Sequence, residues 1–384
     1  MRNVYFESDN IISSLGFTTN QNVERLKAGD GGITMLNDES IYHESFPISL
    51  INKEIFGELS ADNNLNKQYT YAEKLCILSV LEALKKSSVD VKSENTIFVF
   101  STTKGNIDLL DKSKSSTFPN ERLELWAMSE AVSTYFENKN TPITISNACI
   151  SGVVAINIAS ELIQSGQYDN AVVIGVDIVS KFVVSGFHSF KSVAYEPCKP
   201  FDSERVGLTL GEACGTLILT SDESKISDAK IKYCGGSSAN DANHISGPSR
   251  TAEGSVIAIN KTLQQANCNP SEIDHISAHG TATPYNDEME SIAITRCEMT
   301  NAPVNSLKGF WGHTLGAAGV IETIALSHSM RQNIMFPTLG YNTHGVTQNI
   351  SVIKQTTSKE ITKALKMASG FGGCNAALLI EKTK

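Results

Sequence analysis

The amino-acid sequence predicts an α/β fold in which helices cover sheets of largely buried strands. Short runs of β-branched and apolar residues recur along the chain, and several are apolar on consecutive positions, as strands buried on both faces are. Longer stretches with helical spacing of apolar residues lie between these runs. The alternation of the two patterns is typical of sheets covered by helices.

Each expected element has its own pattern in the sequence. Strands are expected at residues 96–100, 143–145, 171–176, 216–219, 273–278 and 376–380, and helices at 71–86, 255–266 and 316–330. In the first of these helices, Leu75, Leu78 and Leu81 lie near helical spacing, and Lys85 and Lys86 fall in the last turn, where positive charge is favourable. Glycine, proline, asparagine and serine cluster at 235–251 and 280–286, which are therefore expected to be loops.

A strand, a turn and a helix occur twice in the same order. Residues 141–147 lead into Gly152 and an apolar helix, and residues 302–306 lead into Gly319 and a second one. This order is also the commonest unit of α/β proteins, so it indicates a duplication without establishing one.

Composition excludes several classes of protein. The 384 residues are 41% hydrophobic and 19% charged, which is too apolar for disorder and long enough for a large core. A formal charge of −9 argues against a protein that binds nucleic acid by phosphate neutralisation. The eight cysteines include no CxxC pair, which disfavours zinc ribbons and disulfide frameworks. No apolar run of signal-peptide or membrane-spanning length is present, so we expect a cytoplasmic globular protein.

The first segment of chemical interest is Asn147-Ala148-Cys149, followed by a nearly all-apolar stretch from Gly152. Cys149 is expected at the junction between a strand and a buried helix. Backbone N–H groups at a helix N-terminus can stabilise a thiolate and hold an oxyanion, so Cys149 is a candidate nucleophile. The alternative is a structural buried cysteine, which is the commoner role of a lone cysteine.

Two histidines, His275 and His279, end a β-rich run next to Gly280. Their spacing would suggest metal ligands on a helix, but the segment is β-rich and lacks the glutamate of a helical zinc motif, so no metal is predicted. A histidine at the end of a strand can reach into a cleft as a catalytic imidazole. A pair of structural histidines is the alternative. Asp287 and Glu290 fall at the start of the next helix, where carboxylates complement the helix dipole.

The third segment places Lys308, His313 and Glu322 in a stretch rich in glycine and alanine, which permits sharp turns and close packing. Lys308 and Glu322 near an apolar helix would be costly unless they are paired. A surface lysine and a core histidine are the alternative. Together with Cys149, these segments suggest a cysteine nucleophile with two histidines.

Seven ordered segments match one known family. They are Asn147–Cys149, Lys199–Gly207, Gly211–Ala213, Asp241–His244, His279–Pro284, Lys308–Gly319 and Gly370–Gly373. Through them the sequence resembles the β-ketoacyl-acyl-carrier-protein synthases of the thiolase superfamily, of the elongating type with a Cys-His-His site. The resemblance extends from about residue 15 to the C-terminus and is strongest from residue 144 onward.

The resemblance implies catalytic roles. Cys149 matches the nucleophile that accepts the acyl chain. His279 and His313 match the pair that assists decarboxylation of the malonyl extender and stabilises the resulting enolate. Lys308 matches the active-site lysine, which pairs with the carboxylate matching Glu322.

The resemblance also implies binding roles. Phe371 matches the gating residue of a glycine-rich loop, and its backbone N–H and that of Cys149 match the oxyanion hole. Thr281 and Thr283 match hydroxyls that bind the pantetheine arm. Ser246 is assigned to the same arm, although Ser246-Gly247-Pro248 departs from the family's hydroxyl-rich pattern.

The family's fold has five αβαβα layers in two similar halves, here residues 1–220 with the cysteine and residues 221–384 with both histidines and the lysine. The expected partner is an acyl carrier protein, whose phosphopantetheine arm carries the substrates, so no cofactor is expected. The resemblance also implies a dimer, either of identical subunits or with a ketosynthase-like paralogue. No nucleic-acid partner and no membrane span are expected.

The implied activity is that of an acyltransferase that performs decarboxylative Claisen condensation, elongating a fatty-acid, aryl-polyene or polyketide-type chain. A non-catalytic subunit resembling a chain-length factor is one alternative, but such subunits usually lose the nucleophile, and here Cys149 is present. A thiolase-type acyltransferase is another, because Cys374 stands where the family usually has threonine and thiolases carry a second catalytic cysteine near the C-terminus. His313 in its glycine-rich frame argues against that reading.

Overall fold

The computed structural model describes residues 1–65, 67–111, 118–226, 229–243 and 247–383. The helices are α1 (Thr19–Ala28), α2 (Lys53–Asp62), α3 (Tyr71–Leu84), α5 (Leu125–Tyr135), α6 (Ser151–Gln164), α7 (Lys181–Ser189), α8 (Glu253–Gln265), α9 (Pro284–Arg296), α10 (Lys308–Trp311) and α11 (Ala318–Gln332). The strands of the main sheet are β1 (Tyr5–Ile12), β4 (Thr96–Ser101), β5 (Ile143–Ile145), β6 (Asn170–Asp177), β8 (Ala213–Thr220), β9 (Lys230–Asn240), β10 (His275–Ser277), β11 (Val304–Asn305), β14 (Lys363–Gly370) and β15 (Cys374–Thr383). Smaller sheets contain β2 (Ile33–Leu36), β3 (Phe46–Ser49) and β7 (Leu210–Gly211), and β12 (Ile334–Met335) with β13 (Thr357–Ser358).

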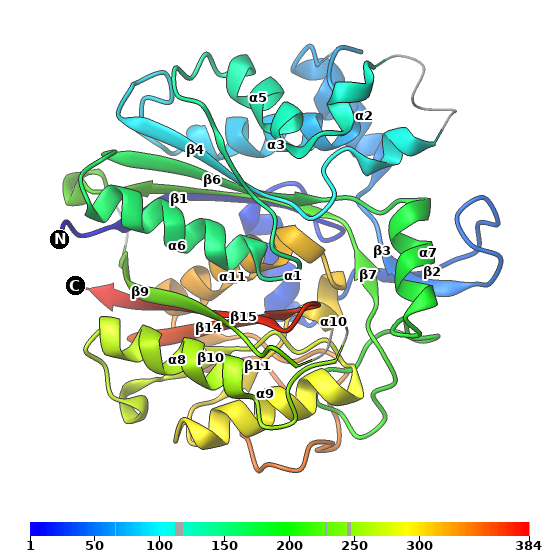
Figure 1. The fold of residues 1–384 in the computed structure, drawn as a ribbon, viewed down its shortest axis with the longest axis vertical. Coiled ribbons are helices and arrows are strands. Elements are labelled where there is room, and N and C mark those ends of the chain that lie inside the picture. The colour runs from blue at the N-terminus through cyan, green and yellow to red at the C-terminus, as the bar shows by residue number, and fades with distance from the viewer. Residues whose placement is uncertain (66, 112–117, 227–228, 244–246, 384) are drawn as a thin grey trace.

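Five layers alternate through the molecule (Figure 1). Helices α3 and α5 cover the outer face of one set of strands, and α8 and α9 cover the outer face of the other set. Helices α6 and α11 form the middle layer between the two sets. The αβαβα fold expected from the family resemblance is therefore confirmed.

The two sets of strands repeat the same topology. In the first set the order is β1-β8-β6-β4-β5, and in the second it is β9-β15-β14-β10-β11. Within each set, the last three strands pair in parallel and the first three are antiparallel. Strands β1 and β9 join the sets through the pair Tyr5 and Lys232. The boundary predicted between residues 220 and 221 lies in the connection from β8 to β9.

The middle helices touch backbone to backbone. Gly152 is the second residue of α6, and Gly319 is the second residue of α11. A Cβ atom on Gly152 would lie 2.8 Å from the Cα atom of Gly319, and one on Gly319 would lie 2.4 Å from the backbone nitrogen of Val153. Both positions therefore need glycine because any side chain would push the helices apart.

Two predicted loops are partly wrong. Strand β9 continues to Asn240 through Gly235 and Gly236, which composition assigned to a loop. A Cβ atom on Gly236 would lie 2.0 Å from Oδ1 of Asn157, so glycine serves close packing here rather than a turn. The loop predicted at 280–286 ends early, because α9 begins at Pro284, a residue that fits the first turn of a helix.

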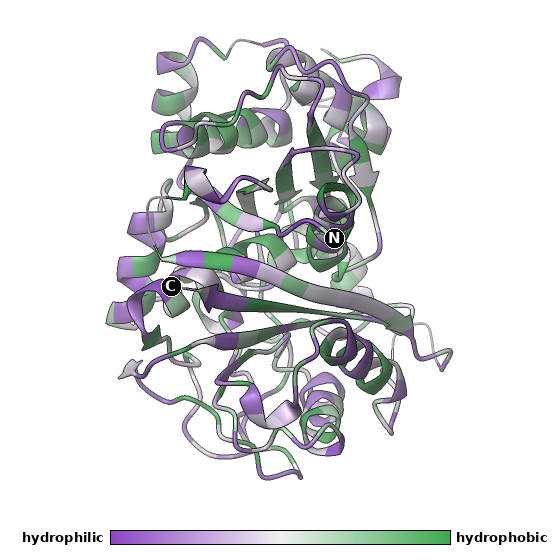
Figure 2. Ribbon diagram, turned by 90° about the vertical axis from the view of Figure 1, so that its left-hand side faces the viewer, coloured by the Kyte–Doolittle hydropathy of each residue, from purple (hydrophilic) through white to green (hydrophobic). Residues whose placement is uncertain are grey.

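The core lies on the strands and on the middle helices. Every residue of β4, β6 and β8 is buried, as their continuous apolar runs predict. Figure 2 shows hydrophobic residues concentrated on these inner elements, with hydrophilic residues more frequent on the outer loops. Across the described ranges, no helix combines the length and the apolar character needed to cross a membrane.

Candidate active site

A cavity of about 510 Å³ opens where the two halves meet. Among the residues that line it are Cys149 from the first half and His279, His313, Thr281, Thr283 and Phe371 from the second. One cavity is thus lined by the predicted nucleophile, the two predicted imidazoles, two predicted pantetheine contacts and the predicted gate. Ser246, the remaining predicted pantetheine contact, lies outside the described residues.

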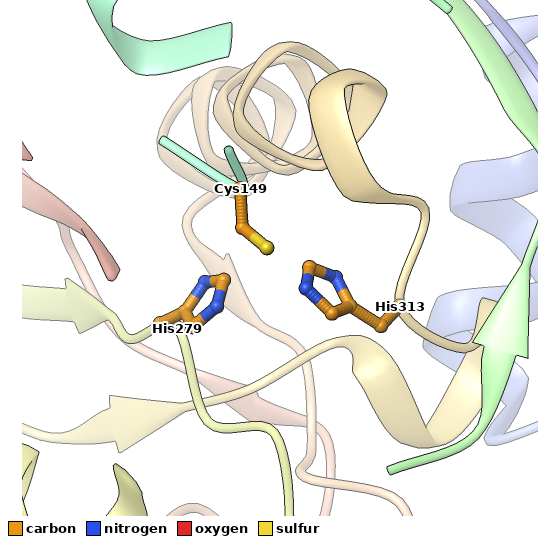
Figure 3. Close-up of side chains that lie close together, drawn as sticks. All are labelled: Cys149, His279 and His313. Carbon is orange, nitrogen blue, oxygen red and sulfur yellow. The ribbon is translucent and has the colours of Figure 1, made fainter. Parts of the chain in front are cut away.

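Cys149 stands at a sharp turn directly before α6. Ile150 is the N-cap residue of this helix. Ala148 has a positive backbone angle φ of 44°, which residues other than glycine rarely adopt. The Ser151 hydroxyl supports the turn by donating to the carbonyl of Ala148 at 2.6 Å and accepting from the N–H of Asn147 at 2.8 Å. The sulfur points from this turn toward the space between the rings of His279 and His313 (Figure 3), and Cys149 is one of the residues that line the cavity.

The sequence suggested that the helix N-terminus would stabilise a thiolate. Instead, burial raises the pKa of the Cys149 thiol to about 12; Cys374 adds to the increase, and Lys308 opposes it. Cys149 is therefore a thiol at neutral pH, and its proton has to be removed as it reacts.

Two imidazole rings lie beside this sulfur (Figure 3). His279 follows β10, and His313 follows α10. One ring nitrogen of each histidine and the Cys149 sulfur lie within 4.8 Å of one another. His275, the other histidine singled out from the sequence, is buried within β10 and is not among the described residues that line the cavity.

Lys308 is fully buried next to His279 and is not among the described residues that line the cavity. Its Nζ atom is 2.7 Å from Oε1 of Glu322, so the ion pair implied by the family resemblance is present. Nζ also donates to the carbonyl of His279 at 2.6 Å and lies 3.3 Å from its Nδ1. Because an ammonium group can only donate, Nδ1 accepts this bond, and the proton of the neutral ring is on Nε2.

Both imidazoles are held neutral. Burial lowers the pKa of His279 well below its ordinary value, and Lys308, His313 and Lys366 lower it further. The pKa of His313 is also lowered well below the ordinary value, first by burial and then by the two lysines. Neutral imidazoles can both accept a proton and donate a hydrogen bond.

Two carboxylates that sequence analysis assigned to a helix dipole instead hold the loop of His279. Glu290 accepts the backbone N–H groups of His279 and Gly280 at 2.7 and 2.6 Å. Asp287 accepts the N–H groups of Phe201 and Ala282 at 2.7 and 3.2 Å. Burial raises the pKa of Glu290 to about 7, although the N–H groups of Gly280 and His279 oppose the increase. Both side chains are buried, so the dipole interpretation missed their main contacts.

Lys366 was missed altogether. It is fully buried on β14, with Nζ 2.8 Å from Oε2 of Glu322. The signal was a lysine inside the apolar run Ala364-Leu365-Lys366-Met367-Ala368, where both neighbours along the strand are apolar. A lysine with no polar face to occupy is costly unless it has buried partners.

Phe371 forms part of the cavity wall at the turn between β14 and β15. Its ring is stacked on Phe187, with centroids 5.6 Å apart, and meets the ring of Phe190 edge-on at 5.2 Å. Gly372 and Gly373 follow with φ values of 87° and 74°, so glycine is required for this turn.

Cys374 lies beneath this turn. Its thiol donates to the carbonyl of Phe371 at 3.3 Å, and Cys374 is not among the described residues that line the cavity. Burial raises the pKa of Cys374 to about 11. These contacts favour a structural role for Cys374 over that of a second catalytic cysteine.

Comparisons with known proteins agree with this geometry. Residues 60–225 match the family described as "Beta-ketoacyl synthase, N-terminal domain", and residues 229–342 match "Beta-ketoacyl synthase, C-terminal domain". A relative from Rhizobium meliloti, "3-oxoacyl-[acyl-carrier-protein] synthase 2", is 27% identical over 422 aligned positions that cover 100% of this chain and 99% of the relative.

A relative from Arabidopsis thaliana, "3-oxoacyl-[acyl-carrier-protein] synthase, mitochondrial", is 33% identical over 250 residues, which are 60% of this chain. That alignment spans about half of the relative's length, 54%. Among solved structures, a "Ketosynthase (ApeO) in Complex with its Chain Length Factor (ApeC) from Xenorhabdus doucetiae" matches with a TM-score of 0.86 at 25% identity, covering 100% of this chain and 98% of the other.

Proposed function

Because this chain belongs to the β-ketoacyl synthase family, we propose that it condenses an acyl chain held on Cys149 with malonyl-acyl carrier protein, with loss of carbon dioxide. The observation that carries this proposal is the cluster of a thiol and two imidazoles, with reactive atoms within 4.8 Å of one another, at the wall of a cavity. The product is a fatty-acid, aryl-polyene or polyketide-type chain that is two carbons longer.

In the first step, the Cys149 sulfur attacks the acyl thioester of the carrier protein. The bond between sulfur and acyl carbon forms, the bond to the pantetheine sulfur breaks, and the Cys149 proton passes through an imidazole to the departing thiol. A neutral imidazole is needed because a thiol with a pKa of about 12 must give up its proton as it attacks.

In the second step, malonyl-acyl carrier protein enters the cavity. Its carbon–carboxylate bond breaks, carbon dioxide leaves, and the electron pair remains as an enolate. Nε2–H of His279 donates to the enolate oxygen, and His313 stabilises the same oxygen from the other side. The ion pair of Lys308 with Glu322 holds the His279 ring in the tautomer that this step needs.

In the third step, the enolate carbon attacks the acyl carbonyl on Cys149. The oxyanion of the tetrahedral intermediate is held by the backbone N–H groups of Cys149 and Phe371. Collapse of the intermediate breaks the bond to Cys149, and the released thiolate takes up a proton from solvent through an imidazole, which restores the thiol for another cycle. Thr281 and Thr283, whose hydroxyls are 2.9 Å apart at the cavity wall, bind the pantetheine arm of either carrier.

Two partners belong to this proposal. The first is acyl carrier protein, which delivers both substrates. The second is another ketosynthase-like subunit, identical or paralogous, paired along β5, which ends the main sheet. A cytoplasmic location stays a prediction.

The test is mass spectrometry of Cys149 after incubation with an acyl-loaded carrier protein. An enzyme gains the mass of the acyl group on Cys149, and Cys149→Ala gains nothing. A chain-length-factor-like subunit would leave Cys149 unmodified even when its partner subunit is present, and that result would overturn the proposal.

A further inference from the structure

Lys366 is a buried lysine whose ammonium group contacts hydrogen-bond acceptors. Its Nζ atom donates to the carbonyl groups of Ser277, Ala278 and Met367 at 3.2, 3.1 and 2.8 Å, and it forms an ion pair with Glu322 at 2.8 Å. The side chain has no exposed surface. An ammonium group has three donors, and this one has four acceptors around it, but burial still lowers the pKa of Lys366 from its ordinary value.

The two lysines act on neighbouring carbonyl groups. Lys366 binds the carbonyls of Ser277 and Ala278, and Lys308 binds the carbonyl of His279, the next residue. Both ammonium groups share the carboxylate of Glu322, one on each oxygen. On the opposite side, Glu290 accepts the N–H groups of His279 and Gly280. The backbone around His279 is thus held through its carbonyl groups by the two lysines and through its N–H groups by Glu290.

We propose that Lys366 is a positioning residue for the reaction proposed above: it anchors Glu322 and the end of β10 so that the His279 ring stays opposite His313. Without Lys366, Glu322 would keep one cation instead of two, and the carbonyl groups of Ser277, Ala278 and Met367 would each lose a donor. Of the two lysines, only Lys308 would then bind this stretch of backbone. Because an error of about 1 Å in placing a catalytic group can cost roughly 100-fold in rate, this anchoring matters for chemistry.

Lys366 also adds positive charge beneath the two imidazoles. The charged and titratable groups near them include Cys149 before α6, Lys308 on α10, Glu322 on α11, Lys366 on β14, and Glu290 and Asp287 on α9, and Lys191 and Asp241 line the same cavity. Lys366 is among the causes that lower the pKa of both histidines. Its removal should therefore make both rings easier to protonate.

The test compares Lys366→Met, which keeps length without charge, with Lys366→Arg, which keeps the charge. Lys382→Met is the matched control, because Lys382 on β15 also donates to a backbone carbonyl, that of Met330 at 3.0 Å, away from the cavity. We expect Lys366→Met to lower kcat for decarboxylation of malonyl-acyl carrier protein by roughly 100-fold with little change in KM. Lys382→Met should retain the wild-type kcat.

The second readout needs no turnover. Diethyl pyrocarbonate modifies histidine only when the imidazole is neutral, and mass spectrometry gives the rate at His279 and His313 separately. As the pH is lowered from 7.5, we expect the rate in Lys366→Met to begin to fall at a higher pH than the rate in the wild type or in Lys366→Arg. If Lys366→Met does not fold, Lys366→Gln, which retains a donor, is judged by the same criteria.

The two proposals fail separately. A folded Lys366→Met or Lys366→Gln variant with wild-type kcat and wild-type histidine reactivity would overturn the role of Lys366. A wild-type protein that never turns over malonyl-acyl carrier protein would overturn the proposed function, while the histidine rates would still decide whether Lys366 positions this site.

Discussion

The imidazole rings of His279 and His313 stand almost perpendicular, with centroids 5.0 Å apart and an interplanar angle of 85°. This arrangement lets two rings approach one small substrate atom from different directions without stacking on each other. Both rings are buried and have pKa values lowered well below the ordinary 6.5. Their neutrality at physiological pH is therefore a property of the site.

Because both imidazoles are neutral, we expect the rate of Cys149 acylation to stay constant as the pH falls below neutrality. A group with a lowered pKa stays deprotonated until the pH falls below that lowered value, so the base remains available well below pH 6.5. We expect the single-turnover rate of acylation to stay level from pH 7.5 to about 6. A rate that declines with a midpoint at 6.5 or above would show that the imidazoles titrate normally.

Substitution of Cys149 should separate the two chemical steps. Cys149→Ala should abolish condensation while the thermal unfolding temperature stays close to that of the wild type, because this side chain is a nucleophile rather than a packing residue. Cys149→Gln mimics the acylated state, so release of carbon dioxide from malonyl-acyl carrier protein should persist or rise. Loss of decarboxylation in Cys149→Gln would contradict the division of labour between the cysteine and the histidines.

Phe371→Ala tests the predicted gate. The ring is half-buried between Phe187 and Phe190, beside a turn that requires two glycines. If it controls entry, the variant should still acylate Cys149 but should decarboxylate malonyl-acyl carrier protein without a primed acyl chain.

A packing role for Phe371 predicts a different result. Removal of a core phenyl ring costs about 3–5 kcal/mol of unfolding free energy and should lower every activity in parallel. Chemical denaturation of the variant and the wild type measures this difference. A variant that unfolds like the wild type and keeps fully coupled turnover would contradict both interpretations.

The free edge of β5 predicts a dimer. This strand ends the ten-stranded sheet, and its three residues are partly exposed. An apolar edge without a partner favours pairing with another strand, because its backbone groups need hydrogen bonds. Light scattering at micromolar concentration should give twice the mass of one chain for the protein alone, or the mass of a heterodimer with a paralogue. The mass of a single chain under both conditions would disprove the prediction.

Chelation tests the expectation that no metal takes part. Cys149, His279 and His313 place one sulfur and two imidazoles within 4.8 Å, a set that zinc could also bind. In the mechanism proposed above these atoms are a nucleophile and two hydrogen-bonding groups, so dialysis against EDTA should leave turnover unchanged. Added zinc should inhibit by occupying the same atoms. A loss of activity with EDTA that zinc restores would point to a metal enzyme.

Sequence reasoning identified the residues that face the cavity better than those that support them. Cys149, His279 and His313 stand in motifs with glycines and small residues, and family resemblance made their roles explicit. Glu290 acts through backbone groups, which any sequence supplies, so no spacing rule marks it. Lys366 is marked only by its place inside an apolar strand, which says that it needs buried partners but not which ones.

The errors in the fold have a similar cause. Gly235 and Gly236 suggest a loop by composition, but they continue β9 because Asn157 on α6 packs against that strand. Contacts between distant segments decided this case and overrode local propensity. The strands of β4, β6 and β8, whose apolar runs are continuous, were predicted within three residues at each end.

The contact of Gly152 with Gly319 gives the molecule the character of two half-size subunits permanently linked in one chain. Each glycine holds the equivalent position in its own half, so the contact has the symmetry of a dimer interface. The candidate active site lies between the two halves, and one half supplies the sulfur while the other supplies both imidazoles. Neither half alone contains both the sulfur and the imidazole pair, and a change that separates α6 from α11 by a methyl group would act on the distance between nucleophile and base as directly as a change at the cavity itself.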